Sequence, residues 1–218
     1  MKITLYYFNI PFWRAEVSRL ALFIGDIDFE DYRINKEEYN TFKEIGELPN
    51  KKIAPFKQLP VLDVDGKIFA QTGAIARYCG KLSGLYPKNN SYEAALIDQI
   101  IEAAQDINYM YTLSSRDKDI EKRKIAREIL ATKHLPKWFK FLENLIEQNN
   151  ESNWFVGNKI SIADLAIWRL TGWLSSGIID GVPKSILISF NKLDNLKKEV
   201  DRHPKVKEWM LKTYGKEI

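Results

Sequence analysis

LPVLDVDGKIFA, residues 59–70, contains two short apolar runs that are separated by Asp65-Gly66. Apolar and polar residues alternate within this stretch, which is typical of strands with one buried face. An Asp-Gly pair between two such runs favours the tight turn of a β-hairpin. We therefore predict a hairpin here, followed by a helix from Gln71 to Gly80.

The residues before the hairpin alternate between strand-like and helix-like patterns. Strands are predicted from Lys2 to Phe8 and from Phe29 to Ile34, and helices from Arg14 to Ile24 and from Glu37 to Ile45. Gly25 is expected to end the first of these helices as a C-terminal glycine. The predicted order, β-α-β-α-β-β-α, indicates a mixed sheet with helices on its faces.

The pattern changes after Pro87. Residues 92–113, 119–148, 161–174, 190–200 and 204–213 all look helical, and strand-like alternation is absent. Ser161 and Asp164 have the spacing of a capping box, although Asp stands where Glu or Gln is preferred. We predict an α/β domain over residues 1–83, a linker over 84–91 and an all-α domain over 92–218.

Composition narrows the class of protein. The single cysteine, Cys79, excludes an internal disulfide framework and favours a reducing compartment. No apolar run is long enough to span a membrane, and no leader is recognised, so a cytoplasmic location is expected. The net charge is +4, but charges of both signs alternate over residues 117–128. A solvated helix face is a simpler interpretation of these alternating charges than a surface that binds nucleic acid. We expect no metal site, no nucleic-acid partner and no membrane partner.

Six segments, taken in order, resemble segments of the cytosolic glutathione transferases. They are residues 5–8 with 14–20, then 56–62, 65–66, 71–78, 154–158 and 161–166. The pattern is closest to the tyrosine-type classes, especially the sigma class, which includes glutathione-dependent prostaglandin D synthases. The resemblance implies a thioredoxin-like N-terminal domain, an all-helical C-terminal bundle, glutathione as co-substrate, and a homodimer.

The resemblance makes Tyr7 the candidate catalytic residue. A hydrogen bond from a phenol to sulfur stabilises the thiolate, which is the reactive form of a thiol. The chain departs from the family here, because Arg14 follows Tyr7 by seven residues instead of six and Trp13 replaces a glycine. Anchoring on the arginine would place Phe8 at the catalytic position. We prefer Tyr7 and one extra loop residue, because strand register is harder to change than loop length.

The resemblance also implies a set of glutathione contacts. Leu59 would pair with the tripeptide through its backbone, next to a cis bond to Pro60, although the residues alone favour a trans proline. Gln71 and Thr72 open a helix whose amides and dipole suit a carboxylate, and Thr72 could equally be only an N-cap. The remaining implied contacts are Arg14, Tyr39, Lys43 and Gln58, with Glu102 and Asp106 from the partner subunit. For all of these except Arg14, the simpler interpretation is a surface side chain.

The electrophile is expected to be small and apolar and to contact Phe12, Trp13, Gln105, Tyr109 and Trp209. Isomerisation or peroxide reduction could use the same thiolate. Cys79 lies late in a helix and not after the first strand, so we predict a buried structural thiol and not a catalytic one. Two alternatives remain: a related protein that binds glutathione without catalysis, favoured by the Trp13 loop, and a ligand carrier.

Overall fold

The N-terminal part of the chain contains a four-stranded mixed sheet, whose strands lie within residues 3–70. The computed structural model describes residues 1–215. The strands β1 (Ile3–Tyr7), β2 (Glu30–Arg33), β3 (Val61–Val64) and β4 (Lys67–Ala70) lie in the order β2-β1-β3-β4. β1 runs parallel to β2 and antiparallel to β3, and β4 pairs antiparallel with β3. The predicted hairpin is confirmed, and Asp65 and Gly66 both have positive φ angles, 47° and 85°.

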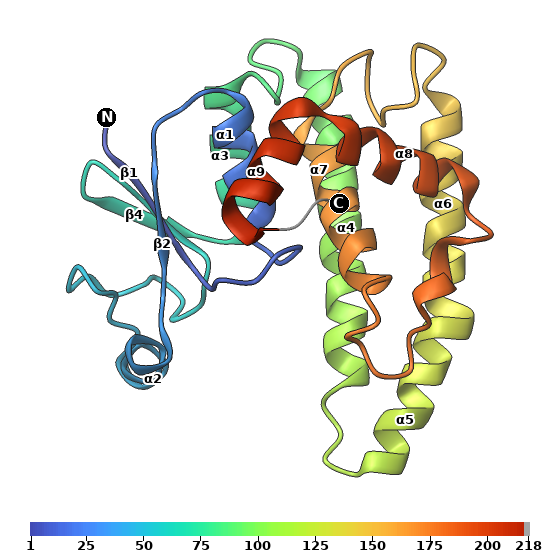
Figure 1. Ribbon diagram of the computed structural model, residues 1–218, viewed down its shortest axis with the longest axis horizontal. Helices are drawn as coiled ribbons and strands as arrows, with labels where there is room; N and C mark the ends of the chain where they lie inside the picture. The colour runs from blue at the N-terminus through green and yellow to red at the C-terminus, as the bar shows by residue number, and fades with distance from the viewer. Residues whose placement is uncertain (216–218) are drawn as a thin grey trace.

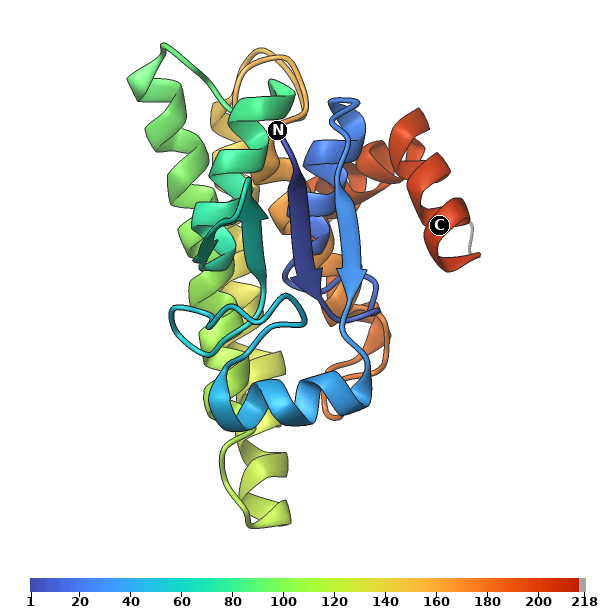
Figure 2. The ribbon, with the colours of Figure 1, turned by 90° about the vertical axis from the view of Figure 1, so that its left-hand side faces the viewer.

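Three helices cover the two faces of this sheet. α1 (Glu16–Ile24) and α3 (Thr72–Ser83) pack on one face, where their apolar residues join the large core. α2 (Lys36–Ile45) packs on the other face, where Phe42 meets Tyr6 and Val61 in a second core. Figure 1 shows α1 and α3 between the sheet and the helical domain, and Figure 2 shows α2 crossing beyond the end of the strands. The predicted element order of this half is therefore confirmed.

Gly25 ends α1 as predicted, but for a different reason. Its φ angle is −82°, so no left-handed cap is formed. A Cβ atom at this position would lie 2.4 Å from the Cβ atom of Ser83 at the end of α3. Close approach of the two helix ends, and not a backbone conformation, therefore requires the glycine.

The second half of the chain is helical. It contains α4 (Ser91–Ser114), α5 (Ile120–Ile129), a π-helical turn η1 (Leu130–His134), α6 (Leu135–Gln148), α7 (Ile162–Leu174), a 3₁₀ turn η2 (Lys184–Leu187), α8 (Asn191–Arg202) and α9 (Pro204–Tyr214). The long helix predicted over residues 119–148 is thus a run of α5, η1 and α6. The all-α domain was predicted to extend to residue 218, and residues 216–218 lie outside the described part of the chain. The domain boundaries stay a prediction.

α7 is the central helix of this half. All its residues from Ile162 to Gly172 are buried, and it packs against α4, α8 and α1. The predicted capping box is present. Asp164 accepts hydrogen bonds from the backbone N–H groups of Ser161 (2.7 Å) and Phe155 (2.9 Å). Because α1 packs directly on α7, the helical domain reaches the face of the sheet domain on which Tyr7 lies.

Candidate active site at the end of the sheet

Strand register brings several of the residues that are predicted to contact glutathione to one end of the sheet, where β1 and β4 end and β3 begins. Tyr7 is the last residue of β1, and its neighbour Tyr6 is paired with Val61 at the start of β3. Val61 is in turn paired with Ala70, the last residue of β4. Leu59-Pro60 precedes Val61, and Gln71-Thr72 follows Ala70. These residues therefore lie at the same end of the strands as Tyr7. The predicted cis bond between Leu59 and Pro60 is confirmed.

Tyr7 and Tyr6 face opposite sides of the sheet. Tyr7 is 2% exposed and belongs to the large core with α1 and α3, whereas Tyr6 belongs to the small core beside α2. Tyr6 packs against Tyr32 at a ring distance of 5.2 Å. β1 ends at Tyr7, and residues 8–15 form the loop between β1 and α1. Phe8 is already outside the strand and packs edge-on against Tyr39, at 4.9 Å between ring centres.

Burial determines the protonation state of Tyr7. It raises the pKa of the phenol to about 12, against the opposing effects of Arg14, Arg169 and Arg19 and of a hydrogen bond from the Arg14 backbone amide. The phenol therefore keeps its proton at neutral pH. In that state Tyr7 is a hydrogen-bond donor and not a general base.

The loop after β1 is anchored on the helical domain. Phe12 has a φ angle of 58°, and its ring packs on Trp168 of α7 at 4.8 Å. Gly172 of α7 leaves room for that ring, because a Cβ atom there would lie 2.5 Å from it. Trp13 is instead half-buried beside Tyr7, with 6.1 Å between ring centres. Of the two aromatic residues of this loop that were expected in the electrophile pocket, Trp13 thus lies next to Tyr7, while Phe12 packs on α7.

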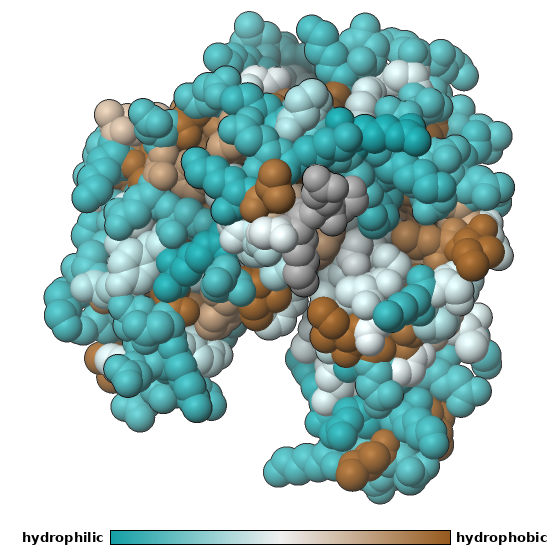
Figure 3. Space-filling model, in the orientation of Figure 1, coloured by the Kyte–Doolittle hydropathy of each residue, from teal (hydrophilic) through white to brown (hydrophobic). Residues whose placement is uncertain are grey.

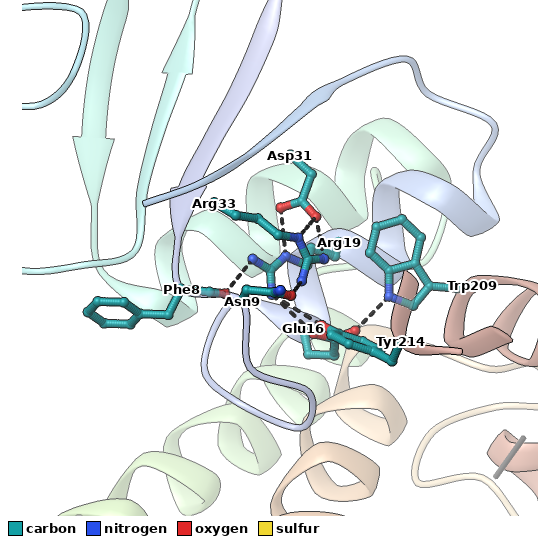
Figure 4. Close-up of polar contacts among 8 residues, drawn as sticks. All are labelled: Phe8, Asn9, Glu16, Arg19, Asp31, Arg33, Trp209 and Tyr214. Atoms are coloured by element: carbon teal, nitrogen blue, oxygen red, sulfur yellow. Dashed lines mark hydrogen bonds and ion pairs between the residues drawn. The ribbon is translucent and has the colours of Figure 1, made fainter. Parts of the chain in front are cut away.

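A buried polar network supports this loop from α1 and was missed by the sequence analysis (Figure 4). Arg19 donates to the backbone oxygen of Phe8 at 2.9 Å and pairs with Asp31 of β2 at 2.8 Å. It also pairs with Glu16, one helical turn before it, at 3.2 Å. The three-residue spacing of Glu16 and Arg19 within the helix was the available signal, but nothing in the sequence indicated that both would be buried.

The same network connects α1 to the C-terminal helix. Trp209 Nε1 donates to Glu16 Oε1 at 2.6 Å, and the Tyr214 hydroxyl donates to Glu16 Oε2 at 2.7 Å. The Trp209 ring also packs on Phe23 and Phe29. These contacts give Trp209 a packing role between α9 and the sheet domain. Its expected place in the electrophile pocket is therefore not supported.

The start of α3 has free backbone amides. The residue before the helix, Gln71, provides no capping side-chain hydrogen bond, and its φ angle is 81°, which is strained for a residue other than glycine. Thr72 is the first residue of the helix and not its N-cap. Such a helix start attracts anions through its unpaired N–H groups and the positive end of the helix dipole. The interpretation of Thr72 as only an N-cap is therefore wrong.

Comparison with known proteins identifies the family. The N-terminal domain model of glutathione S-transferases matches residues 3–81, and a C-terminal domain model of the same family matches residues 105–213. The chain is 30% identical to glutathione S-transferase A3 of Homo sapiens, with 96% of this chain and 88% of the relative covered. The chain belongs to the glutathione S-transferase family.

Solved structures with the same fold include a prostaglandin synthase and a glutathione S-transferase. One is described as prostaglandin synthase D of Nilaparvata lugens and has a TM-score of 0.83 at 29% identity, with 97% of this chain and 98% of that chain covered. Another is a glutathione S-transferase of Necator americanus that is described as monomeric, with a TM-score of 0.77 at 27% identity and 97% coverage of both chains. These comparisons support a glutathione-transferring enzyme with a thioredoxin-like first domain, in agreement with the prediction.

A notch separates the α2 side of this glutathione S-transferase from the α4–α5 side. Figure 3 shows it as a hollow at the lower edge of the molecule, and Figure 1 places the loop after β1 at its upper end. On the first side, Lys43 is exposed on α2 and Gln58 is exposed before β3. On α4, Tyr109 is exposed and Gln105 is half-buried.

Glu102 and Asp106 of α4 are both exposed. Glu102 pairs with Arg77 of α3 at 2.5 Å, and Arg77 also pairs with Asp98 at 2.6 Å. This pairing holds the Glu102 carboxylate near Gly73, in the first turn of α3. The predicted contribution of Glu102 and Asp106 to a partner subunit's site stays a prediction.

Cys79 is buried in α3, as predicted, and burial raises the pKa of its thiol to about 12. Within residues 1–215, no group of three or more potential metal ligands is brought together. Over the same range, no helix has the length and apolar character required to cross a bilayer.

Proposed function

We propose that this glutathione S-transferase joins the thiolate of glutathione to a small apolar electrophile, and that Tyr7 stabilises the thiolate. The observation that carries the proposal is that three features lie at the same end of the sheet. They are the buried, protonated phenol of Tyr7, the unpaired backbone just before β3, and the uncapped start of α3. In this substitution the thiol proton leaves to solvent, a sulfur lone pair forms the new bond to the electrophilic atom, and the leaving group departs with the electron pair of the bond that breaks.

The backbone features suit an extended tripeptide. Leu59 lies just outside the β3 ladder, whose pairing begins at Val61, so its backbone groups are available to an added strand. The uncapped start of α3 at Gln71 and Thr72 would hold the γ-glutamyl carboxylate. Lys43 would pair with the glycine carboxylate.

Tyr39 and Gln58 complete the proposed glutathione contacts. Arg14 would act beside Tyr7, because its backbone amide and its charge both favour negative charge at the phenol oxygen.

The electrophile would enter the notch from the α4 side. Trp13 narrows the space beside Tyr7, and Gln105 and Tyr109 would form the facing wall. Isomerisation at the same thiolate is a further proposed activity, since one structural relative is a prostaglandin synthase.

We propose a homodimer in which Glu102 and Asp106 approach the partner's glutathione site. One structural relative is described as monomeric, so the oligomeric state requires its own measurement by light scattering.

The test compares wild type with Tyr7→Phe for retention on immobilised glutathione and for thiol conjugation. Tyr6→Phe is a matched control, because it removes the same hydroxyl from a neighbouring residue on the opposite face of the sheet. We expect all three proteins to be retained and Tyr7→Phe alone to lose conjugation, by about 100-fold, the scale of one lost transition-state hydrogen bond. Retention of all three without turnover in wild type would favour the non-catalytic alternative, and absence of retention would contradict the proposed glutathione site.

A further inference from the structure

Basic residues are concentrated on one segment of the helical domain. Residues 120–141 contain seven Lys or Arg and two Asp or Glu, a net charge of +5, whereas the whole chain has a net charge of +4. The rest of the chain therefore has a net charge of −1. From residue 129 to residue 142 the sequence contains no Asp or Glu. The basic excess of this protein is thus local, and it lies on the run of α5, η1 and α6.

Three lysines of this segment form one row. Lys133, Lys137 and Lys140 follow one another by four and three residues, which is the spacing of side chains on one face of a helix. All three are exposed. Lys133 lies in η1 and the other two lie in α6, so the row extends across the junction of these elements.

The carboxylates that follow on α6 are directed to α8. Glu143 is buried and accepts from the backbone N–H of Lys192 at 2.8 Å. Glu147 lies 3.7 Å from the Nζ atom of the same lysine. These two acidic groups therefore meet the start of α8 and not the lysine row.

A row of ring side chains runs beside the lysines. His134, Trp138 and Phe141 have the same four- and three-residue spacing, and each follows a lysine of the first row by one position. Phe141 is 48% exposed, and its ring centre lies 6.2 Å from that of the half-buried Trp138. Lys137 Nζ lies 5.7 Å from the centre of the Phe141 ring. We call the two rows together the α6 face; its residues are 133, 134, 137, 138, 140 and 141.

An apolar hollow adjoins the start of the ring row. It has a volume of about 350 Å³ and lies between the end of α4 and the run of α5 and η1, with His134 in its lining. Apart from His134 and Ser114, the side chains that line it are apolar. Leu113 and Ile129 of this lining are 44% and 39% exposed. Positive charge, exposed rings and an apolar hollow thus lie next to one another.

This combination fits an amphiphile with an anionic head better than it fits other anions. Basic helices with Trp or Phe beside their lysines lie in the interface of a bilayer, where the lysine stems extend along apolar surface and the ammonium groups reach the headgroups. Single-stranded nucleic acid is bound in a basic groove and has no use for an apolar hollow. A second copy of this chain would bring two lysine rows together, which is repulsive.

We propose that the α6 face docks on an anionic lipid surface, with the lysine row against the headgroups, Phe141 at the acyl boundary and the hollow open to an acyl chain. No membrane partner was expected from the sequence, because no apolar run is long enough to span a bilayer. A face that lies on a surface needs no such run. Figure 1 shows α6 on the side of the helical domain that is farthest from the sheet, so docking there leaves the candidate glutathione site open to solvent.

The test is co-sedimentation of the full chain with vesicles of phosphatidylserine and phosphatidylcholine, and with vesicles of phosphatidylcholine alone. The basic variant carries Lys133→Gln, Lys137→Gln and Lys140→Gln. Wild type should bind only the vesicles that contain phosphatidylserine, and added salt should weaken this binding. Each lysine near an anionic surface is worth about fivefold in binding, so the basic variant should bind about 100-fold more weakly.

A matched control removes the same charge from other places. It carries Lys67→Gln, Lys159→Gln and Lys207→Gln, which are exposed lysines on β4, on the loop before α7 and on α9. This variant should bind the vesicles within about threefold of wild type, because its lysines lie away from the docked face. Equal losses in the two triple variants would show that net charge, and not the α6 face, attracts the protein, and would overturn the proposal.

Two further variants test the ring row. Phe141→Ser should weaken vesicle binding by about fivefold, because it removes apolar surface that would leave water. Trp138→Phe should keep the binding and lose the quenching of tryptophan emission by brominated acyl chains. Unchanged quenching in Trp138→Phe would show that the α6 face does not meet the bilayer, and would overturn the proposal.

The source of the anionic group is tested separately. Inorganic phosphate should displace the protein from vesicles no better than chloride at the same ionic strength. Specific displacement by phosphate, or retention on single-stranded DNA without vesicle binding, would assign the lysine row to another anion and overturn the lipid proposal. Thiol conjugation and Tm should be unchanged in the two triple lysine variants. Absence of vesicle binding by a wild type that still conjugates glutathione would therefore contradict this proposal alone.

Discussion

Glu16→Gln tests whether the C-terminal helix is held on the active-site domain through one buried carboxylate. Three donors converge on Glu16: Trp209 Nε1 at 2.6 Å, the Tyr214 hydroxyl at 2.7 Å and Arg19 Nη1 at 3.2 Å. The side chains of Glu16 and Arg19 are fully buried. The amide of Gln has one acceptor oxygen, so at least one of these donors would face an N–H group instead.

The expected cost follows from the partners that remain. Breaking a buried ion pair by removing one partner costs about 3–5 kcal/mol. Arg19 keeps its pair with Asp31 and its bond to the Phe8 backbone oxygen, so we expect the lower end, about 3 kcal/mol. At about 2–4 °C per kcal/mol for a chain of this size, Tm should fall by about 6–12 °C.

Thermal unfolding followed by circular dichroism measures this change. Glu44→Gln is the matched control, because Glu44 is exposed on α2 and the same substitution should move Tm by less than about 2 °C. A double-mutant cycle with Trp209→Phe should give a coupling energy of about 1–3 kcal/mol, since the two residues share one hydrogen bond. If Glu16→Gln lowers Tm no more than Glu44→Gln does, or if the coupling is zero, the network does not hold α9 in place.

Three further outcomes are expected from other parts of the molecule. Cys79 should react with a thiol reagent only as fast as the native protein opens, because its thiol is buried with a pKa near 12; immediate stoichiometric labelling without denaturant would contradict this. Asp164→Asn should destabilise the fold by about 2–3 kcal/mol in urea unfolding, because an amide N–H₂ would face a donor of Ser161 or the Phe155 backbone; a change below 0.5 kcal/mol would be inconsistent with the capping box. Gly172→Ala should lower kcat/KM by displacing Phe12 and the loop beside the active site, and adding Phe12→Ala should restore part of the loss; no loss in the single variant would show that the loop tolerates the displacement.

Local sequence patterns determined the elements and their order. The Asp65-Gly66 turn can be predicted because few residue pairs accept positive φ angles at both positions, and the structure has these angles there. The Ser161–Asp164 spacing predicted the start of α7 for a similar reason, since capping depends on residues three positions apart. The local pattern already placed Tyr7 near the end of the first strand, and the family resemblance added the cis bond before Pro60, which no local pattern contained.

Contacts between distant segments were decided only by the tertiary structure. The contacts of three aromatic residues expected in the electrophile pocket could not be predicted from the sequence: Phe12 packs on Trp168 of α7, Trp13 lies beside Tyr7, and Trp209 donates to Glu16. Gly25 is required by the end of α3, 58 residues further along the chain, and not by its own backbone.

Arg169 shows the same limit most clearly. Its position within a helix was evident from the sequence, but its burial and the lack of a hydrogen-bond partner for its Nε and Nη1 atoms among residues 1–215 were not. Helical periodicity specifies which residues share a face of one helix. Which charge that face brings against another segment, and whether it finds a partner there, depends on how α7 docks against the sheet domain.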